Sequence, residues 1–211
     1  MMFRLRNEAR QAGGDCIYLL GNHEFLNLIQ DYRYVSWMDL ASFVGKRRFA
    51  FSQQGWIGKE LRKLQVSALV HGTVFVHGGI TEEWASLGVD GINKQARRFL
   101  KNDTKSQLST RKILVSEEGP LWFRGYAQED EYTVCPKLKK VLDLLGAKRM
   151  VMSHTITPDH RINVRCQGKA ILIDTAISSA IHGGRISALE LSNTHTRAIY
   201  QHKIVHLNPS I

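Results

Sequence analysis

Hydrophobic positions recur along this chain with two spacings, and each spacing predicts a type of element. Apolar residues three and four positions apart predict helices; we place these at residues 3–12, 50–65, 90–102 and 135–147, with a further helix beginning near Asn22. Short continuous apolar runs predict buried strands at residues 16–20 and 73–77. The last helix has the clearest bounds, because Pro136 suits a first turn and Gly146 suits a helix end.

The C-terminal third changes to short β-rich segments separated by turns. These segments are RMVMSH, INVR, AILIDT, RISALEL and TRAIY, between residues 149 and 200. Strand following strand at this spacing predicts an antiparallel sheet. Helices and strands together predict a layered α/β fold, with a polar loop at residues 103–118. In such folds, ligands bind at the carboxyl ends of the strands.

Size and composition describe a globular protein. The chain has 211 residues, which suits a single domain spanning 1–211, and 43% of them are hydrophobic and 23% charged. No apolar run approaches the roughly 20 residues that span a bilayer. The N-terminus has no apolar signal core, so a cytoplasmic location is expected. The three cysteines are too few and too scattered for a disulfide framework or a thiolate zinc site. Their scarcity suits a reducing compartment. Cys16 is expected to pack within its strand.

The net charge is +10, and the basic residues are spread along the whole sequence. A dispersed excess of this kind is typical of a solvated surface that also raises the local concentration of anionic substrates. Aromatic residues are not interleaved with the basic ones, as they are in single-strand readers, so no specific nucleic-acid binding is expected. A basic nucleic-acid-binding protein with structural histidines stays as an alternative, which strongly salt-dependent binding would reveal.

Polar residues follow three of the predicted strands at the point where each strand ends. The three sequences are Gly21-Asn22-His23-Glu24, His77-Gly78-Gly79 and Ser153-His154-Thr155. Each places a histidine after an apolar run, and the glycines let the backbone turn and a ligand come close. If these strands are neighbours in one sheet, their histidines converge.

Asn22, His77 and His154 have the chemistry of a metal shell, because two imidazoles and an amide oxygen suit Zn, Fe or Mn. A single histidine at a strand end is more often a satisfied polar residue. Three histidines with the same context favour a shared site. The remaining histidines lack this context and are assigned to surface or structural positions: His71, His160, His182, His195, His202 and His206.

These motifs resemble those of a known family. LLGNHEFLNL resembles the Gly-Asn-His-Glu box of the metal-dependent phosphoprotein phosphatases, within the calcineurin-like metallophosphoesterase superfamily. TVFVHGGI resembles their His-Gly-Gly box, and RMVMSHTITP resembles their last metal-binding box. GPLWFRGY and ILIDTAIS are most similar to the bacterial-like branch, the Shewanella-like phosphatases. The resemblance runs from about residue 10 to residue 200.

The resemblance implies a β-sandwich flanked by helices, in α-β-β-α layers, and a site for two divalent ions (Mn, Fe or Zn). Asn22, His77 and His154 match ligands of the second metal, and His23 matches the residue that gives a proton to the leaving oxygen. In the family, a metal-bridging hydroxide attacks the phosphorus of a phosphoprotein or other phosphomonoester. Arg124 is expected to contact the phosphate, because a guanidinium pairs with two of its oxygens; the alternative is an ordinary surface arginine.

Two boxes of the family, Gly-Asp-x-His-Gly and Gly-Asp-x-x-Asp-Arg-Gly, do not occur in this sequence. They supply the first metal's ligands, the bridging Asp and a phosphate-binding Arg. We therefore expect an N-terminally truncated domain that lacks its first strands, exposes an apolar edge at residues 16–20 and has activity near background. Ser153 and Ala176 stand where the family has Gly. Glu24 and Asp174 are expected to be structural, at a helix N-terminus and in a turn.

The leading hypothesis is a metal-dependent phosphoprotein phosphatase. One alternative is an inactive pseudophosphatase that binds phosphorylated partners, and another is a diadenosine-polyphosphate hydrolase on the same fold. The motifs do not separate phosphotyrosine from phosphoserine and phosphothreonine substrates. Residues 30–50 and 103–118 are expected to shape the substrate entrance, because surface loops carry specificity.

Overall fold

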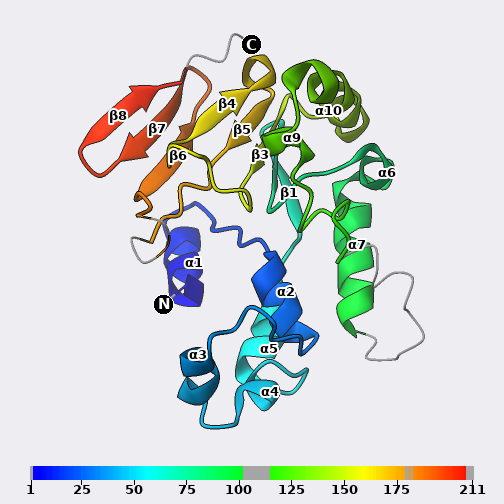
Figure 1. Cartoon of the computed structure of the whole chain (residues 1–211), viewed down its shortest axis with the longest axis vertical. Coiled ribbons are helices and arrows are strands. Elements are labelled where there is room, and N and C mark those ends of the chain that lie inside the picture. Colours follow the sequence, from blue (N-terminus) through cyan, green and yellow to red (C-terminus); the bar gives the residue numbers. More distant parts are fainter. Residues whose placement is uncertain (1, 102–114, 179–180, 182, 208–211) are drawn as a thin grey trace.

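A computed structural model describes residues 2–101, 115–178, 181 and 183–207, and its strands form two sheets (Figure 1). The five-stranded sheet has the order β1-β2-β3-β5-β4 and is built from β1 (Ser67–Val70), β2 (Thr73–Val76), β3 (Arg149–Met152), β4 (Asn163–Arg165) and β5 (Ala170–Leu172). The three-stranded sheet is built from β6 (Ser187–Leu191), β7 (Thr196–Tyr200) and β8 (Lys203–His206). Most of the polar loop predicted at residues 103–118 lies outside the described residues.

The helices are α1 (Met2–Gln11), α2 (Asn22–Leu28), α3 (Trp37–Ser42), α4 (Arg47–Ala50), α5 (Trp56–Leu61), α6 (Glu82–Ala85), α7 (Gly88–Lys101), α9 (Gly125–Gln128) and α10 (Glu131–Leu145), with a 3₁₀ turn η2 (Cys166–Gly168). The helices predicted near the N-terminus, at Asn22 and before residue 102 are confirmed by α1, α2 and α7. Figure 1 shows α2 to α5 as a group below the five-stranded sheet.

The central strands β2, β3 and β5 run parallel, and β1 and β4 pair antiparallel at the two edges of the sheet. The antiparallel sheet expected for the C-terminal third is therefore wrong for β3 and β5. Several helices, ending with α10, connect β2 to β3, and a crossover of this kind permits parallel pairing. The expectation is confirmed for β4 with β5 and for β6 to β8.

The two faces of the five-stranded sheet pack against different partners, because successive side chains of a strand point to opposite faces. The core on the helix side includes Val74, Met150, Ala170, Ile92 of α7 and Leu138 of α10. The core on the other side includes Val151, Ile171 and Ala198 of β7. The molecule is therefore a mixed α/β fold in which helices cover one face of the main sheet and a second sheet packs on the other (Figure 1).

Helix α10 begins earlier than the sequence analysis expected. The Asp130 side chain caps its N-terminus by accepting a hydrogen bond from the Tyr132 amide at 2.8 Å. Pro136 therefore lies one turn further into the helix, and its prediction as a first-turn residue is wrong. Gly146 ends the helix as predicted, with a left-handed φ of 61°.

The helix predicted at residues 50–65 is shorter than expected: only Trp56–Leu61 forms a helix, α5, and α4 ends at Ala50, the first residue of the predicted segment. The chain folds back on itself at Gly55, where a Cβ would collide with the carbonyl oxygen of Phe49. Trp56, the first residue of α5, is 57% exposed.

The strand predicted at residues 16–20 is also wrong. In the described ranges the segment pairs only through a single parallel bridge, between Leu19 and Gln65, which is too short to make a strand ladder. Ile17 is 47% exposed, in line with the apolar edge expected here, and Cys16 is only half-buried. A cavity of about 550 Å³ separates this segment from Phe75 and other apolar residues of the main sheet.

A disulfide joins Cys135 of α10 to Cys166, at the turn between β4 and β5. The expectation that the cysteines form no disulfide is wrong, and the reducing compartment inferred from it loses its support. The two residues are 31 positions apart, and only the packing of α10 against this turn brings their Cα atoms to 5.3 Å.

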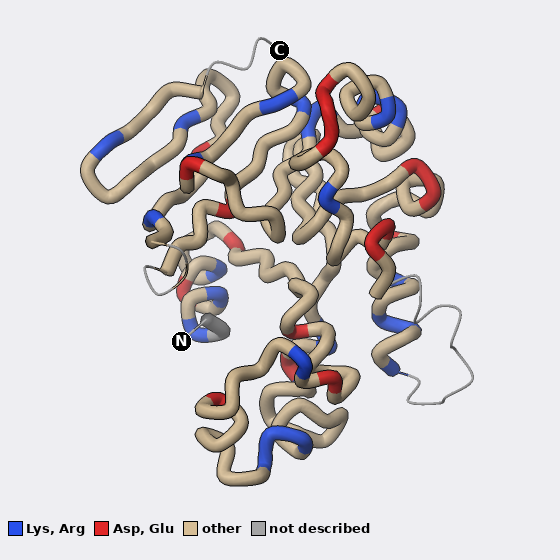
Figure 2. Tube along the Cα trace, viewed as in Figure 1, with Lys and Arg blue, Asp and Glu red and all other residues tan. Residues whose placement is uncertain are grey.

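Charged residues of both signs lie on every part of the described molecule, and Lys and Arg do not gather on one face (Figure 2). This agrees with the dispersed charge seen in the sequence. None of the helices in the described ranges is long and apolar enough to cross a lipid bilayer.

Candidate metal and phosphate site

Two histidines follow the carboxyl ends of parallel neighbouring strands. Val76 of β2 lies opposite Met152 of β3, so the residues after them emerge at the same edge of the sheet. The Ser153 amide donates a hydrogen bond to the His77 carbonyl at 2.9 Å, which ties the two strand ends together. The rings of His77 and His154 have centroids 4.9 Å apart. The predicted convergence of these two histidines is present.

Asn22 joins them from the first turn of α2. Its side chain is buried, and its Oδ1 lies 2.8 Å from Nε2 of His77. The Glu24 carboxylate accepts a hydrogen bond from the Gly21 amide at 3.2 Å, so its expected structural role at the helix N-terminus is confirmed. Gly21 has no room for a side chain, because a Cβ would lie 2.7 Å from Glu24 Oε2 and 3.2 Å from the His77 ring.

His23 follows Asn22 and remains exposed at the start of α2. Its backbone carbonyl accepts a hydrogen bond from Asn27 Nδ2 at 2.8 Å, and Asn27 Oδ1 in turn accepts one from Arg47 Nε at 2.9 Å. The ring of Tyr34 lies 5.5 Å from the His23 ring, centroid to centroid. The turn that carries His23 is therefore anchored to its own helix and to α4, while the His23 residue itself is exposed.

Arg124 reaches the same edge of the sheet from the residue before α9. Its Nη1 donates to the His154 carbonyl at 3.0 Å and to Thr155 Oγ1 at 3.2 Å. The loop that carries Arg124 lies directly against Gly78, whose amide donates to the Pro120 carbonyl at 2.9 Å. This close approach requires a glycine, because a Cβ at residue 78 would lie 2.8 Å from the Trp122 nitrogen.

Both histidines are held neutral by their surroundings. Burial lowers the pKa of His77. Burial, and then the neighbouring Arg124 cation, lowers the pKa of His154 to about 3. The His154 ring makes a hydrogen bond with the Trp122 backbone, while its Nε2 is buried and has no hydrogen-bond partner among the described residues. A neutral imidazole with one nitrogen fixed and the other free is the form that binds a metal ion, so these residues fit a divalent cation.

A second cluster with metal-binding atoms is excluded by its chemistry. Glu131, Cys135 and Cys166 have ligand atoms within 4.8 Å of one another, and they are the one such group of three or more His, Cys, Asp or Glu in the described ranges. The two sulfur atoms are bonded to each other, whereas a metal requires the thiolate. Oε2 of Glu131 already accepts a hydrogen bond from the Cys166 amide at 2.8 Å.

Asp174 orders the turn after β5, as predicted. Its carboxylate accepts hydrogen bonds from the Ala176 amide at 3.1 Å and from Ser153 Oγ at 3.3 Å. Ala176 has a φ of 49°, which is the left-handed conformation that favours glycine, the residue found at the matching position in the family.

Sequence reasoning missed two aromatic residues at the site, Tyr34 and Trp122. Trp122 packs edge-on against the His154 ring, at a centroid distance of 5.6 Å and an interplanar angle of 84°. Tyr34 lies within the segment 30–50 that was expected to shape the entrance, and Trp122 is two positions before Arg124. Trp122 lies within GPLWFRGY, the motif that marked Arg124, whereas Tyr34 has no spacing or motif that could have marked it.

The known proteins that this chain resembles include protein phosphatases. No family model matches the chain. The chain is 33% identical over 216 residues to an uncharacterized protein of Schizosaccharomyces pombe, covering 96% of this chain and 64% of that protein. It is 30% identical over 186 residues to Shewanella-like protein phosphatase 1 of Plasmodium berghei, covering 84% of this chain and 51% of that one. The crystal structure of a cold-active protein-tyrosine phosphatase from a psychrophilic Shewanella species matches with a TM-score of 0.84 and 28% identity, over 98% of this chain and 62% of that one.

The fold is thus that of a protein phosphatase, because nearly the whole chain superposes on the solved structure. Among the phosphatases, the likeness is to the Shewanella-like protein phosphatases, as the motifs predicted. The chain spans between about half and two thirds of the length of the proteins it matches.

Proposed function

We propose that this chain forms part of a metal-dependent phosphomonoester hydrolase of the phosphoprotein phosphatase type. The observation that carries the proposal is the meeting of five side chains from distant parts of the sequence at one edge of the main sheet: Asn22, His23, His77, Arg124 and His154. The fold likeness to solved tyrosine phosphatases supports it.

Asn22, His77 and His154 would hold a divalent ion such as Mn, Fe or Zn, one of the two in the family's site. Their support is the 2.8 Å approach of Asn22 Oδ1 to His77 Nε2, together with the unpartnered Nε2 of His154. When bound, the metal supplies a Lewis acid that polarises the phosphoryl group and lowers the pKa of a water molecule.

Arg124 binds and orients the phosphate in this proposal. Its guanidinium is already held beside His154 by two hydrogen bonds from Nη1. A planar guanidinium matches two phosphate oxygens and remains charged at every working pH. The same cation disfavours protonation of His154, which keeps that imidazole available as a ligand.

His23 donates a proton to the ester oxygen as it leaves. The ring stands exposed at the first turn of α2, one residue after the proposed ligand Asn22. An imidazolium can donate a proton to a departing oxygen, which suits a general acid. The anchored turn keeps this ring on the open side of the proposed metal ligands, where the leaving group departs.

One observation favours a second candidate, a pseudophosphatase that binds phosphorylated partners without hydrolysing them. The sequence as given contains neither Gly-Asp-x-His-Gly nor Gly-Asp-x-x-Asp-Arg-Gly. In the described ranges, the two carboxylates that act on His77 are Glu24 and Asp174, and each already accepts a hydrogen bond from a backbone amide. In this candidate, Arg124 and the three proposed ligands still bind phosphate and metal, but the phosphate ester is not hydrolysed.

Two measurements test the proposal. Titration calorimetry with Mn²⁺ is expected to show binding that His154→Ala abolishes and that His202→Ala, a change at an exposed hairpin turn, leaves intact. Hydrolysis of p-nitrophenyl phosphate with Mn²⁺ is expected to be near background for the chain as given; in a chain that also carries the two absent boxes, His23→Ala is expected to lower it by about 10²-fold while Mn²⁺ affinity stays the same. Unchanged Mn²⁺ binding in His154→Ala refutes the ligand set. Binding of Mn²⁺ and phosphate without turnover establishes the pseudophosphatase instead.

A further inference from the structure

A second cavity lies between the edge strand β4 and the second sheet, and its volume is about 420 Å³. Three parts of the chain line it: β4 with the loop that precedes it, Arg185 before β6, and the hairpin of β7 and β8. The described residues that line it include none of the five side chains on which the proposed function depends. The cavity is therefore separate from the candidate metal and phosphate site.

Three cationic side chains line this cavity: Arg161, Arg185 and Lys203. Other arginines of the molecule have carboxylate partners, such as Arg33 with Asp31 and Arg197 with Glu190. Within the described part of the chain, none of the three cations of the cavity makes such an ion pair. Charges of one sign around a concave surface repel one another and raise the local concentration of anions.

The backbone that carries the two arginines is held by its own hydrogen bonds. The Arg185 amide donates to the Thr175 carbonyl at 3.0 Å, and the Arg185 carbonyl accepts from Thr175 Oγ1 at 2.7 Å. The Arg161 carbonyl accepts from Thr157 Oγ1 at 2.7 Å. The one carboxylate of the described lining, Asp159, accepts a hydrogen bond from the Arg161 amide at 3.1 Å. The cations are thus presented to the cavity by ordered chain, so a ligand would not have to order it.

Tyr200 connects the two walls of the cavity. Its hydroxyl oxygen accepts a hydrogen bond from the Ile162 amide at 2.9 Å, which ties β7 to the residue before β4. The Arg185 guanidinium lies 5.9 Å from the centre of the Tyr200 ring, a contact that orients the cation. Part of the remaining lining is apolar, as at Val164 and Val205, which are half-buried. The cavity therefore offers both cations and apolar surface to one ligand.

We propose that this cavity is a second ligand site, which binds an organic diphosphate such as a nucleoside diphosphate. A terminal phosphate is largely doubly charged at neutral pH, so a diphosphate brings about three negative charges to the three cations. Guanidinium groups match pairs of phosphate oxygens. The volume lies within the range of small-molecule pockets, about 300–1,000 Å³, which leaves room for an organic group against the apolar lining. The proposal goes beyond the proposed function and does not depend on it.

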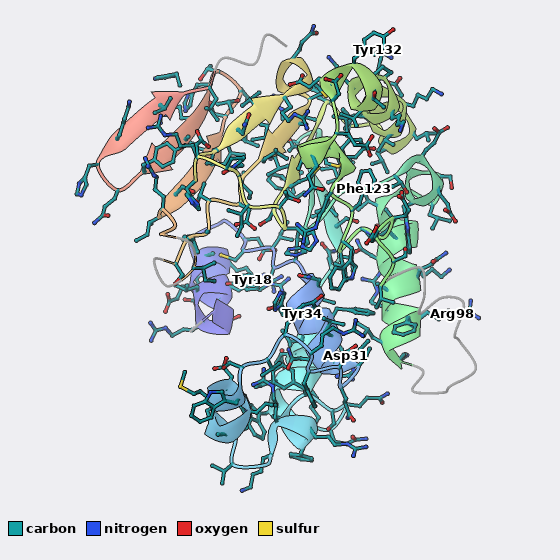
Figure 3. The ribbon with its side chains drawn as sticks, viewed as in Figure 1. Tyr18, Asp31, Tyr34, Arg98, Phe123 and Tyr132 are labelled. Carbon is teal, nitrogen blue, oxygen red and sulfur yellow. A yellow bond between two sulfur atoms is a disulfide. The ribbon has the colours of Figure 1, made fainter. Side chains whose placement is uncertain are left out.

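Titration calorimetry with EDTA present tests the site, because the chelator removes any contribution of a metal ion. The wild-type protein is expected to bind ADP about fivefold more tightly than AMP, since ADP brings one more charge to exposed cations. Arg161→Ala and Arg185→Ala are each expected to lower the affinity for ADP about fivefold. Arg98→Ala is the matched control and should bind ADP like the wild type, because Arg98 is an exposed arginine of α7, on the helix side of the main sheet (Figure 3).

Four results would overturn the proposal, and they are distinguishable. The wild-type protein may show no ADP binding at millimolar concentration. Arg161→Ala and Arg185→Ala may both bind ADP like the wild type, with unchanged circular dichroism. Loss of ADP affinity in Arg124→Ala, with affinity kept in the two cavity variants, would place ADP at the candidate phosphate site instead. Inorganic pyrophosphate that binds as tightly as ADP would show that the apolar lining takes no part, so the ligand is not an organic diphosphate.

Discussion

Removal of the Cys135–Cys166 disulfide is expected to destabilise the fold without rearranging it. The Cys166 amide donates to Glu131 Oε2 at 2.8 Å, and Arg165 donates to the Tyr126 and Glu129 carbonyls, so non-covalent contacts also hold the turn against α10. Because these contacts remain after reduction, the main effect falls on the unfolded chain, which gains the freedom that the bond had removed.

The magnitude follows from the 31-residue separation of the two cysteines. Closing a loop of that length lowers the entropy of the unfolded chain by about 12 cal/mol/K, which corresponds to about 3.7 kcal/mol at 25 °C. A domain of this kind has a total free energy of unfolding of about 5–15 kcal/mol. Loss of the disulfide therefore removes a large part of the free energy of unfolding.

Urea unfolding followed by tryptophan fluorescence measures this loss. Cys135→Ala, compared with the oxidised wild type, is expected to unfold with a free energy lower by about 3–4 kcal/mol. Cys16→Ala is the matched control, because Cys16 is the free cysteine of the described residues. A loss below about 1 kcal/mol, or alkylation of Cys135 in the native protein without reductant, would refute the reasoning.

Three further predictions concern the core and the site. Asn93 is buried and makes three hydrogen bonds to the backbone at the start of β1, one of them from Nδ2 to the Ser67 carbonyl at 2.8 Å. Asn93→Ala should therefore lower the free energy of unfolding, measured in urea, by about 3 kcal/mol or more. A loss under about 1 kcal/mol would contradict this. Gly78→Ala should push the Trp122 backbone away and weaken phenylphosphonate binding roughly tenfold, and wild-type affinity in calorimetry would disprove the steric argument. His154 has a folded-state pKa of about 3 against an ordinary 6.5, so only the unfolded chain gains this proton as the pH falls through 6.5. The free energy of unfolding, measured with a chelator present, should therefore decrease as the pH falls from 7.5 to 5. The decrease should be larger by about 1–2 kcal/mol in the wild type than in His154→Gln, after allowance for the partial exposure of the ring. An equal pH dependence in the two proteins would rule this out.

Helices and helix ends that depend only on their own residues could be predicted from the sequence. Helix α7 carries its apolar face at Ile92, Ala96 and Leu100, and α10 ends at Gly146, where the helix needs a left-handed residue. Residues 16–20 have an equally clear apolar pattern, yet they form only one bridge. A strand depends on a partner as well as on its own sequence, and a run of apolar residues does not reveal its partner.

The disulfide and the direction of the central strands depend on relations between distant segments. Cys135 and Cys166 meet because α10 packs across the turn between β4 and β5, and no local spacing indicates this. β3 resembles its C-terminal neighbours in composition, but it lies between β2 and β5 and runs parallel to both. Composition predicts that a segment is a strand, whereas its direction is set by the crossover that precedes it.

The candidate ligands were predictable because the sheet does the positioning. His77 and His154 each follow a central strand, so parallel pairing of β2 with β3 alone brings them together. Arg124 was predicted only from its resemblance to a family motif. Tyr34 could not be predicted, because it belongs to an irregular segment whose position is set by ion pairing of Asp31 with Arg33 and by the start of α3.

Two parts of the fold place different groups of the candidate site. Strand ends and the start of α2 place the proposed metal ligands, while the single loop pressed against Gly78 places both Arg124, the proposed phosphate contact, and Trp122. A change in that loop can therefore alter phosphate affinity and also the orientation of His154, because the His154 ring makes a hydrogen bond with the Trp122 backbone. The coupling runs in both directions, because the Arg124 guanidinium donates a hydrogen bond to the His154 carbonyl, so a shift of this strand end moves the proposed phosphate site with it.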